Sequence, residues 1–420
     1  MLRRDVIVFY FPYRGVGGVP TLFLRLAKEL REDFDVHIAD YSDGYMAAHL
    51  PDGVRLIEVD CDPQFPSEAI FVFQAFLPWR FPFFVKISPE ARMLFWVLHP
   101  KNFDPSIFNE YHRIPIVASL ARLANGLAAN RKTRLASFVS YLTASHAIVF
   151  QDRESIRSTS KFLDCVIDSP HFLPIPLPAV SQHKLSRNAG ELRCAWVGRI
   201  CDFKHSILEH LIRRLRKTAD SVGPIRLFII GTGDYLSVVQ DAALEVEGGL
   251  YRIDFLGNMP EANLPTFLAE QVDFLFAMGT SALEGARVGV PVFLTDYSYK
   301  KIEGNYRFRF LYDNSGYCLA EEISPEHIEK QSTLEATIET ALADYLATSQ
   351  RSYQYWEDNF SLDSVTRTFI GHLSDTRATF GQVTSEGYFQ PDFWGRIFRG
   401  AALIARPHLA RENIGFRQDC

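Results

Sequence analysis

The stretch DFLFAMGTSALEGARVGVPV, residues 273–292, decides the fold. Its first five residues form a short apolar run that is typical of a buried strand, and a helical segment follows from Gly279. Gly289 and Pro291 end that helix, and a second strand begins at Val292. The stretch therefore predicts strand, helix and strand in succession, which is the repeating unit of a parallel sheet.

The helix in this stretch is expected to point its N-terminus at the edge where the preceding strand ends. Unpaired amide groups and the positive end of the helix dipole favour a phosphate there. Glu284, one turn into the helix, can accept hydrogen bonds from the hydroxyl groups of a ribose. Ser281 and Glu284 also fit an S-x-x-E capping box, in which Glu284 bonds back to the amide of residue 281. The sequence leaves both roles of Glu284 open.

The same alternation of apolar runs and helical patterns extends along most of the chain and predicts parallel sheets covered on both faces. The expected strands are 6–11, 36–39, 54–59, 69–73, 93–98, 147–150, 192–197, 225–230, 251–256, 273–277 and 292–295, and the expected helices include 21–31, 116–141 and 206–218.

With 420 residues, 47% of them hydrophobic, the chain is too long for one ordinary core. Four prolines between Pro170 and Pro178 and the polar segment 181–190 predict an interdomain linker. We expect an α/β protein with two tandem Rossmann-like, doubly wound parallel-sheet domains that face a cleft. The predicted boundaries are 1–175 and 190–365, with a C-terminal helix and tail over 366–420.

Composition excludes several classes of function. A net charge of −6 argues against a general nucleic-acid binder. The six cysteines are scattered, without a C-x-x-C pair, and favour neither a zinc site nor a disulfide framework. Asp60 and Asp62 could be mistaken for a metal-binding D-x-D motif, but Pro63 favours a turn at the end of a strand. The first residues do not fit a signal peptide, and we expect a cytoplasmic protein.

Two loops in the first half are candidates for ligand contact. Residues 13–20 form a glycine-rich turn, which includes Gly17 and Gly18 and lets backbone approach a ligand at the next helix. The turn is not a dinucleotide fingerprint, because Pro20 stands at the third glycine position and Asp40 only ambiguously supplies the acidic residue. A purely structural turn is the alternative. His99 follows a strand, from where it can contact a sugar or a reacting oxygen, or be structural.

In the second half, residues 196–204 place Arg199 and Lys204 on the loop that leaves a strand. Two cations there can clamp a diphosphate and stabilise it as a leaving group, although either one alone would be ordinary surface charge. The next strand ends in the turn Gly231-Thr232-Gly233. Its glycines fit either close backbone packing or approach to a nucleotide base.

Together these motifs resemble the family-four retaining glycosyltransferases, whose two-domain GT-B architecture binds a nucleotide sugar. The resemblance runs from about residue 6 to 373 and is strongest over 194–294. There V-G-R with a lysine five residues after the arginine, G-x-G, Phe255-Leu256-Gly257 and L-E-G-A-x-x-G-V-P-V occur in the family's order and spacing.

The resemblance implies a set of site residues and no metal or other cofactor, since the nucleotide-diphosphate sugar is itself the substrate. Arg199, Lys204 and His99 are similar to the family's catalytic residues. The implied donor-binding residues are Gly17, Gly18, Gly198, Gly231, Gly233, Gly279, Thr280, Ser281 and Glu284. One position departs from the family: the first glutamate of its E-x7-E pattern, which usually helps to hold the donor sugar, falls on Phe276.

The function implied is transfer of a sugar, with retention, from a nucleotide-diphosphate sugar to a glycan or lipid-linked acceptor in cell-surface polysaccharide synthesis. Two alternatives stay open. Phe276 favours a nucleotide-sugar-binding protein that has lost catalysis, and a sugar-nucleotide epimerase has the same fold. The sequence specifies neither the base, sugar and linkage nor the oligomeric state.

Two segments combine apolar and basic residues in a way that fits either packing or membrane contact. Residues 71–84 are unusually aromatic, and residues 393–406 place apolar residues at helical spacing between arginines. Core or partner packing is one explanation. The other is peripheral contact with the inner face of the cytoplasmic membrane.

Overall fold

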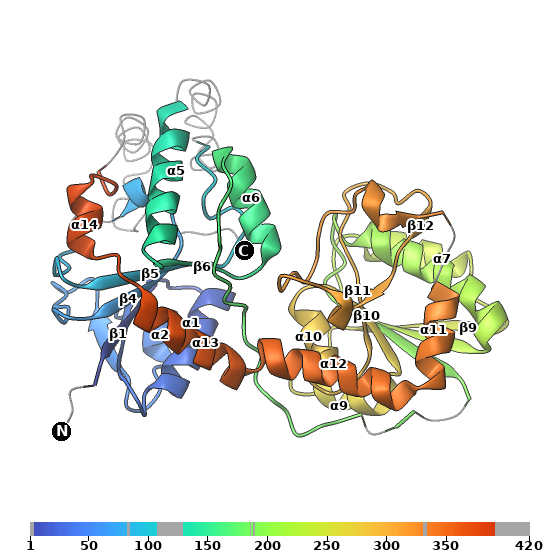
Figure 1. Cartoon of the computed structure of the whole chain (residues 1–420). Coiled ribbons are helices and arrows are strands. Elements are labelled where there is room, and N and C mark those ends of the chain that lie inside the picture. The colour runs from blue at the N-terminus through green and yellow to red at the C-terminus, as the bar shows by residue number, and fades with distance from the viewer. Residues whose placement is uncertain are drawn as a thin grey trace. The chain divides into compact units, whose positions relative to one another are not determined.

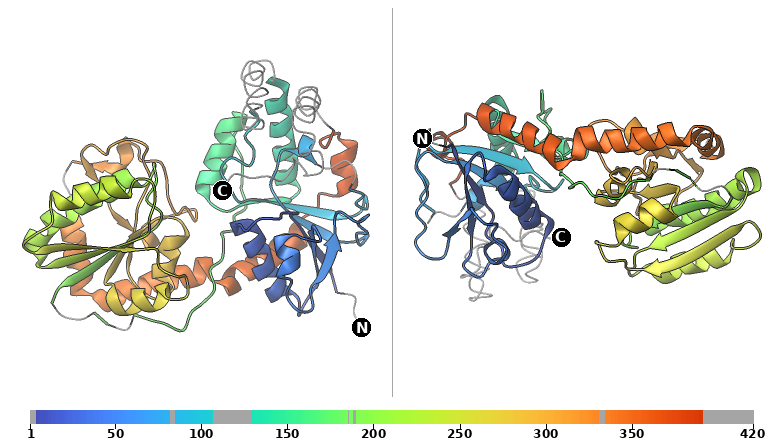
Figure 2. Two further views of the ribbon diagram at one scale, coloured as in Figure 1. Left: turned by 180° about the vertical axis from the view of Figure 1, so that it is seen from behind. Right: turned by 90° about the horizontal axis from the view of Figure 1, so that it is seen from below.

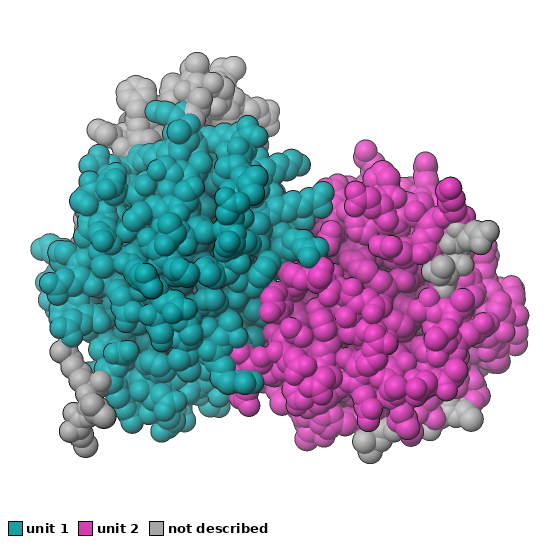
Figure 3. Space-filling view, in the orientation of Figure 1, with its two compact units in different colours: residues 1–175, 365–420 teal, residues 176–364 magenta. Residues whose placement is uncertain are grey.

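The computed structural model describes residues 4–81, 85–106, 129–184, 186–187, 190–330 and 334–390. The chain forms two compact units, shown in different colours in Figure 3. Unit 1 comprises Met1–Ile175 and Val365–Cys420, and unit 2 comprises Pro176–Ser364. The chain therefore returns to unit 1 after it has completed unit 2.

Unit 1 is built on a six-stranded, entirely parallel sheet in the order β3-β2-β1-β4-β5-β6. Its strands are β1 Val6–Tyr10, β2 Asp35–Asp40, β3 Arg55–Glu58, β4 Ile70–Gln74, β5 Arg92–Val97 and β6 Ile148–Phe150. The strands β1, β4 and β5 are almost wholly buried, as expected for a sheet covered on both faces. The order reverses direction between β1 and β4, which makes that position the topological switch point.

Helices cover both faces of this sheet (Figure 1). On one face the ring of Phe9 lies 5.0 Å from Phe23 in α1 and 5.9 Å from Phe369 in α13. On the other face the ring of Phe95 lies 5.5 Å from Phe138 in α5. The helices with residues in unit 1 are α1 Gly18–Leu30, α2 Tyr45–Ala48, α5 Ala129–Ala144, α6 Arg153–Leu163, α13 Leu362–Asp375 and α14 Phe380–Ser385, with the 3-10 turn η1 Pro78–Arg80.

Unit 2 repeats the design with the order β13-β11-β10-β7-β8-β9, in which only the edge strand β13 is antiparallel. The strands are β7 Leu192–Val197, β8 Ile225–Ile230, β9 Tyr251–Gly257, β10 Phe274–Ala277, β11 Val292–Leu294 and β13 Arg309–Phe310; a separate pair consists of β12 Asn305–Tyr306 and β14 Ile328–Glu329. Its switch point lies between β7 and β10.

The side chains of these strands alternate between two apolar layers. Trp196 and Phe276 belong to one layer with residues of α7, α8 and α11, whereas Val197 and Ala277 belong to the other with residues of α9, α10 and α12. Figure 2 shows from two further sides how the helices flank the sheet. The helices are α7 His205–Val222, α8 Leu236–Leu244, α9 Leu264–Gln271, α10 Thr280–Ala286, α11 Leu334–Ala343 and α12 Tyr345–Phe360, with the 3-10 turns η3 Leu311–Asp313 and η4 Pro325–His327.

The predicted fold class, two doubly wound and predominantly parallel sheets, is confirmed. Several predicted helix boundaries were wrong. The helix α1 begins at Gly18 rather than Thr21, because Pro20 is well suited to the first turn of a helix, and α7 extends to Val222 rather than Thr218. The two-residue strands β12, β13 and β14 were not predicted, since they are too short to show a periodic pattern. Of the predicted helix 116–141, the part before Ala129 lies outside the described residues.

The aromatic segment that begins within β4 is part of the core of unit 1. Phe73, Phe76, Trp79 and Phe81 are all buried. Packing therefore explains these side chains, and membrane contact does not. Residues 82–84 and the tail 393–406 lie outside the described residues. Within the described part of the chain, no helix combines the length and the apolar character needed to cross a membrane.

An ion pair is fully buried at the start of β10. Lys184 Nζ lies 3.1 Å from Asp273 Oδ1, and both side chains are almost inaccessible to solvent. The other oxygen of Asp273 accepts the backbone N–H of Arg193 at 2.9 Å, so both carboxylate oxygens are engaged. Lys184 also bonds through its backbone N–H to the carbonyl of Val288. This pair fixes the segment that enters unit 2 to the base of its sheet.

We expect Asp273→Ala to lower the free energy of unfolding by about 3–5 kcal/mol, because it leaves the Lys184 ammonium buried without its counter-charge. Asp220→Ala is the control: it removes an exposed ion pair with Arg216 and should cost less than about 1 kcal/mol. Urea unfolding followed by fluorescence measures both. Equal effects of the two substitutions would contradict the structural role of the buried pair.

Candidate functional site

The candidate residues of unit 2 lie at the carboxyl-terminal edge of its sheet. The loop after β7 carries Gly198, Arg199 and Lys204, the loop after β8 carries Gly231 and Gly233, and α10 follows β10. Because β7, β8 and β10 are neighbouring parallel strands, these loops emerge side by side. The switch point between β7 and β10 is where ligands bind in open α/β sheets.

Close backbone contact holds the loops after β7 and β8 together. The amide of Gly198 donates to the carbonyl of Ile230 at 3.0 Å, and the amide of Ile200 donates to Thr232 at 2.9 Å. A Cβ atom on Gly231 would overlap the carbonyl of Gly198, and one on Gly233 would overlap that of Ile200. Of the two roles left open by the sequence, close packing therefore accounts for these two glycines.

Lys204 stands at the N-cap position of α7 and is half-buried. Its Nζ has no hydrogen-bond or ion-pair partner among the residues that the structure describes. Burial lowers the pKa of Lys204; the nearby Cys201 thiol opposes this shift, and the positive charge of Arg199 adds to it. Arg199 is exposed and likewise has no hydrogen-bond or ion-pair partner in the described ranges. Among the described residues, neither of the two cations at this edge is paired with an anion.

Glu284 does not form the capping box that its spacing allows. The N-cap of α10 is Gly279, in a left-handed conformation with φ of 63°, and no side chain caps the helix. Ser281 is therefore already inside the helix, and the alternative reading of Glu284 as a cap was wrong. Its carboxylate is buried and forms an ion pair with Arg287, one helical turn away. The i, i+3 spacing of the two residues was the sequence signal for this pair.

The backbone amide groups at the start of α10 differ in whether they already have a hydrogen-bond acceptor. The amide of Gly279 donates to the carbonyl of Leu319 at 2.8 Å. The amides of Thr280 and Ser281 have no acceptor within the described residues, and Thr280 is exposed. This end of α10 can therefore offer two N–H groups to an anion.

Phe276 lies inside β10 rather than at its end. Its ring stacks on Phe293 at 4.8 Å and meets Phe308 edge-on at 5.6 Å, and the side chain is fully buried. Only Met278 and Gly279 separate β10 from α10. The family's E-x7-E pattern places its first glutamate at position 276. In this chain that position is therefore part of the core.

In unit 1 the glycine-rich turn after β1 is organised by Asp40. Its Oδ1 accepts the amides of Tyr13 and Tyr41, and its Oδ2 accepts those of Met46 and Ala47. Burial raises the pKa of Asp40, and the four N–H groups counteract that shift. The carboxylate is thus a structural acceptor and is not available as a ribose ligand. An aspartate at the end of a strand was the only sequence signal for this role.

The turn leaves its two candidate glycines in ordinary surroundings. Gly17 is the N-cap of α1 and has an extended conformation, and a Cβ on Gly18 would meet no atom within 4 Å. Neither contact nor conformation demands glycine at position 18, and approach of a ligand stays the prediction for it.

His99 lies at the carboxyl-terminal edge of the same sheet, after β5. Its Nδ1 accepts the amide of Lys101 at 3.1 Å, which leaves the proton on Nε2. The amide of His99 is held by Asn102 Oδ1 at 2.9 Å. Desolvation by the loop and the charge of Lys101 lower the pKa of His99, so a neutral ring can present its Nε2–H to a ligand.

One group of exposed side chains among the described residues could in principle hold a metal ion. Glu58, Asp60 and Cys61 bring three potential ligand atoms within 4.8 Å of one another, and all three residues are exposed. Asp60 accepts hydrogen bonds from the amide and the hydroxyl of Ser42, as expected for a turn. The arrangement supports the turn and gives no reason to assign a metal.

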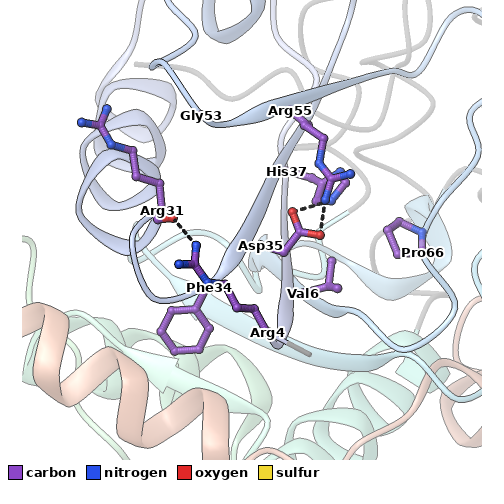
Figure 4. Close-up of a pocket in the computed structure, with 9 residues that line it drawn as sticks. All are labelled: Arg4, Val6, Arg31, Phe34, Asp35, His37, Gly53, Arg55 and Pro66. Carbon is purple, nitrogen blue, oxygen red and sulfur yellow. Dashed lines mark hydrogen bonds and ion pairs between the residues drawn. The ribbon is translucent and has the colours of Figure 1, made fainter. Parts of the chain in front are cut away.

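A pocket of about 470 Å³ in unit 1 lies elsewhere (Figure 4). It is at the edge where β1, β2 and β3 begin, opposite to the edge that carries the candidate loops. Asp35 in this pocket pairs with Arg55 and with His37, and Arg4 donates to the carbonyl of Arg31. The one carboxylate among the lining residues, that of Asp35, is thus already paired.

Comparison with known proteins places the fold. No protein-family model matches the sequence, and no curated protein is similar to it by sequence comparison. The structure is similar to a glycosyltransferase from Rickettsia africae ESF-5, with a TM-score of 0.54 and 12% identity over 89% of this chain and 98% of that one. The fold is therefore the two-domain GT-B fold.

Two further solved structures are similar at lower scores. Anabaena Alr3699/HepE in complex with UDP and glucose has a TM-score of 0.46 and 13% identity over 88% of this chain and 99% of that one. The lipopolysaccharide outer core galactosyltransferase WaaB in its apo form has a TM-score of 0.48 and 10% identity over 89% and 100%. At these identities the similarity concerns the fold alone.

Because position 276 is part of the core, we expect Phe276→Glu to bury an unpaired carboxylate and to destabilise the protein by about 3 kcal/mol or more. Phe276→Leu is the matched control and should cost roughly 1 kcal/mol. Thermal unfolding measures both. A stable Phe276→Glu protein that binds a nucleotide sugar more tightly than the unsubstituted chain would show instead that this position faces the donor.

Proposed function

We propose that the chain is a glycosyltransferase that moves a sugar from a nucleotide-diphosphate sugar to a glycan or lipid-linked acceptor. The fold, which it shares with the Rickettsia africae glycosyltransferase, supports this proposal. So does the placement of Arg199, Lys204 and the start of α10 around the switch point of unit 2.

The observation that carries the proposal is the half-buried ammonium of Lys204. An ammonium group taken partly out of water is unfavourable unless an anion compensates it. No carboxylate of the described residues forms an ion pair with Lys204, and the charge of the neighbouring Arg199 is also positive. A diphosphate supplies the missing negative charge and is also the leaving group of nucleotide sugars.

The proposed reaction proceeds with retention and without a metal. The bond from the anomeric carbon to the diphosphate oxygen breaks, and its electron pair stays with the diphosphate. The acceptor oxygen bonds to the same face of the anomeric carbon, and its proton passes to a diphosphate oxygen. Lys204, Arg199 and the amides of Thr280 and Ser281 stabilise the negative charge that develops. His99 and the turn at Gly17 and Gly18 are proposed to contact the sugar or the acceptor.

We further propose a role in cell-surface polysaccharide synthesis in the cytoplasm, with peripheral contact at the inner face of the membrane. The family resemblance implies the synthetic role. The membrane contact is proposed from the sequence of the tail 393–406, which is outside the described residues. Glu284 is proposed to bind the ribose, which requires its carboxylate to exchange or share Arg287 with the ligand.

Lys204→Ala should lower turnover at least tenfold, because it removes the cation nearest to the proposed leaving group. The control is Lys217→Ala, which removes an exposed lysine from the far part of the same helix. The measurement is release of nucleoside diphosphate from uridine, guanosine and adenosine diphosphate sugars in the presence of candidate acceptors. Equal turnover in the two variants would refute the clamp.

The products separate the proposed function from its alternatives. Free diphosphate together with a glycosylated acceptor supports a transferase. A new nucleotide sugar formed without an acceptor would mean an epimerase, and binding without any turnover would mean a protein that has lost catalysis.

Binding of nucleoside diphosphate should weaken as the pH rises above neutrality, at a pH below the 10.5 of an ordinary lysine, because burial lowers the pKa of Lys204. Above its pKa the neutral amine no longer pairs with the anion. Lys204→Arg should keep its affinity over this range, since a guanidinium stays protonated. Titration calorimetry between pH 7 and 10 measures the difference, and an equal loss of affinity in both proteins would contradict it.

A further inference from the structure

A buried indole lies beside Lys204. Trp196 is the fifth residue of β7 and is fully buried, and its Nε1–H has no hydrogen-bond acceptor among the residues described. Trp96, the corresponding kind of side chain in unit 1, donates to the carbonyl of Leu173 at 2.8 Å. A buried polar hydrogen without an acceptor is uncommon, because the group has lost water and gained nothing in return.

The free N–H of Trp196 and the ammonium of Lys204 converge on one point. A Cβ atom on Gly198 would lie 3.6 Å from Lys204 Nζ and 3.8 Å from Trp196 Nε1. Gly198 has a φ of 155° and no side chain, so no side chain of residue 198 stands between the two nitrogens. Within the described ranges, no other atom outside the two adjacent residues comes within 4 Å of that point.

This convergence distinguishes Trp196 from other buried indoles. The Nε1–H of Trp356 in α12 also has no acceptor within the described part of the chain, and the side chain is equally buried. Trp356, however, lies in the other apolar layer of unit 2, with Tyr353 and Phe360 among its neighbours. An unpaired indole alone therefore does not make a site, whereas one beside a half-buried cation at the switch point does.

The chemistry of the two groups specifies their ligand. An ammonium and an indole N–H are both donors and accept nothing. A group that satisfies both must be an acceptor with negative charge, and a phosphate oxygen meets both conditions.

We propose that Trp196 Nε1–H donates a hydrogen bond to the same diphosphate that pairs with Lys204, which makes Trp196 a donor-binding residue. This inference rests on the proposed function. This role of Trp196 was not predicted from the sequence, because a tryptophan within an apolar strand is expected to be a core residue. Trp196 fills the core with its ring system, while its N–H lies next to Gly198, the first residue after β7.

The test compares Trp196→Phe with Trp356→Phe. Both substitutions remove one buried, unpaired N–H from unit 2 and leave an aromatic ring, so their effects on folding are matched. Titration calorimetry with uridine, guanosine and adenosine diphosphates should show binding about tenfold weaker in Trp196→Phe. Trp356→Phe should bind within twofold of the unsubstituted protein. Binding of the corresponding nucleosides, which lack the diphosphate, should be the same in all three proteins.

A second measurement uses the unsubstituted protein and does not depend on the folding of Trp196→Phe. The chain has five tryptophans, so ¹⁵N-tryptophan labelling gives five indole signals. Single phenylalanine variants at Trp79, Trp96, Trp356 and Trp394 assign four of them and leave the fifth to Trp196. That signal should move downfield when nucleoside diphosphate is added and stay in place with nucleoside.

The outcomes separate this inference from the function on which it rests. If the unsubstituted protein binds a diphosphate, but Trp196→Phe binds it equally well and the Trp196 signal does not move, the inference is overturned and the proposed function stands. If the unsubstituted protein binds none of the diphosphates, both are overturned.

Discussion

The arrangement of the candidate site depends on the close approach of two backbone loops. The carbonyl groups of Gly198 and Ile200 lie where side chains on Gly231 and Gly233 would be, so that only glycine fits at these two positions. Hydrogen bonds from Gly198 and Ile200 to the end of β8 lock the contact. The loop after β7 is thereby fixed in place, and Lys204 at the N-cap of α7 has its ammonium beside Gly198 rather than free in solvent.

In unit 1 the loop after the first strand is also held in place, but by a side chain rather than by backbone contacts. There the turn after β1 is held by a single carboxylate, that of Asp40, which gathers amides from the turn and from the segment after β2. A Cβ on Gly44 would overlap this carboxylate, which explains the glycine before α2. In both units the parallel sheet provides the edge, and local polar contacts decide the shape of the loops on it. In unit 2 these fixed loops hold a few donors, such as Lys204 Nζ, that have no acceptor among the described residues.

Much of the fold follows from the sequence. The strands of both sheets are apolar runs bounded by turn residues, and their alternation with helices predicts parallel pairing. Strand β13, which is antiparallel and two residues long, leaves no such trace. The return of the chain to unit 1 from Val365 is equally hidden, because the apolar face of α13 does not say which sheet it covers. Its packing partners Phe9 and Trp96 are known only from the structure.

Site residues could be predicted from the sequence where a local motif indicates their role. They could not be predicted where the role depends on contacts with residues far away in the sequence. The placement of Arg199 and Lys204 on the loop after a strand follows from the sequence. Glu284 fitted two local roles, and the structure shows a third partner, Arg287, at a spacing that the sequence contains but does not single out. Phe276 and Trp196 are neighbours in adjacent strands and look alike as apolar residues. Only the structure shows that one is wholly core and the other has a polar hydrogen at the functional edge.

The half-buried cation Lys204, at the N-cap of α7, is proposed to bind a diphosphate. The most direct measurement is a crystal structure of the protein soaked with the nucleoside diphosphate that gives the largest thermal shift. The account predicts a phosphate oxygen within hydrogen-bonding distance of Lys204 Nζ, above Gly198. A well-ordered diphosphate bound away from Lys204, with that ammonium still unpaired, would contradict it.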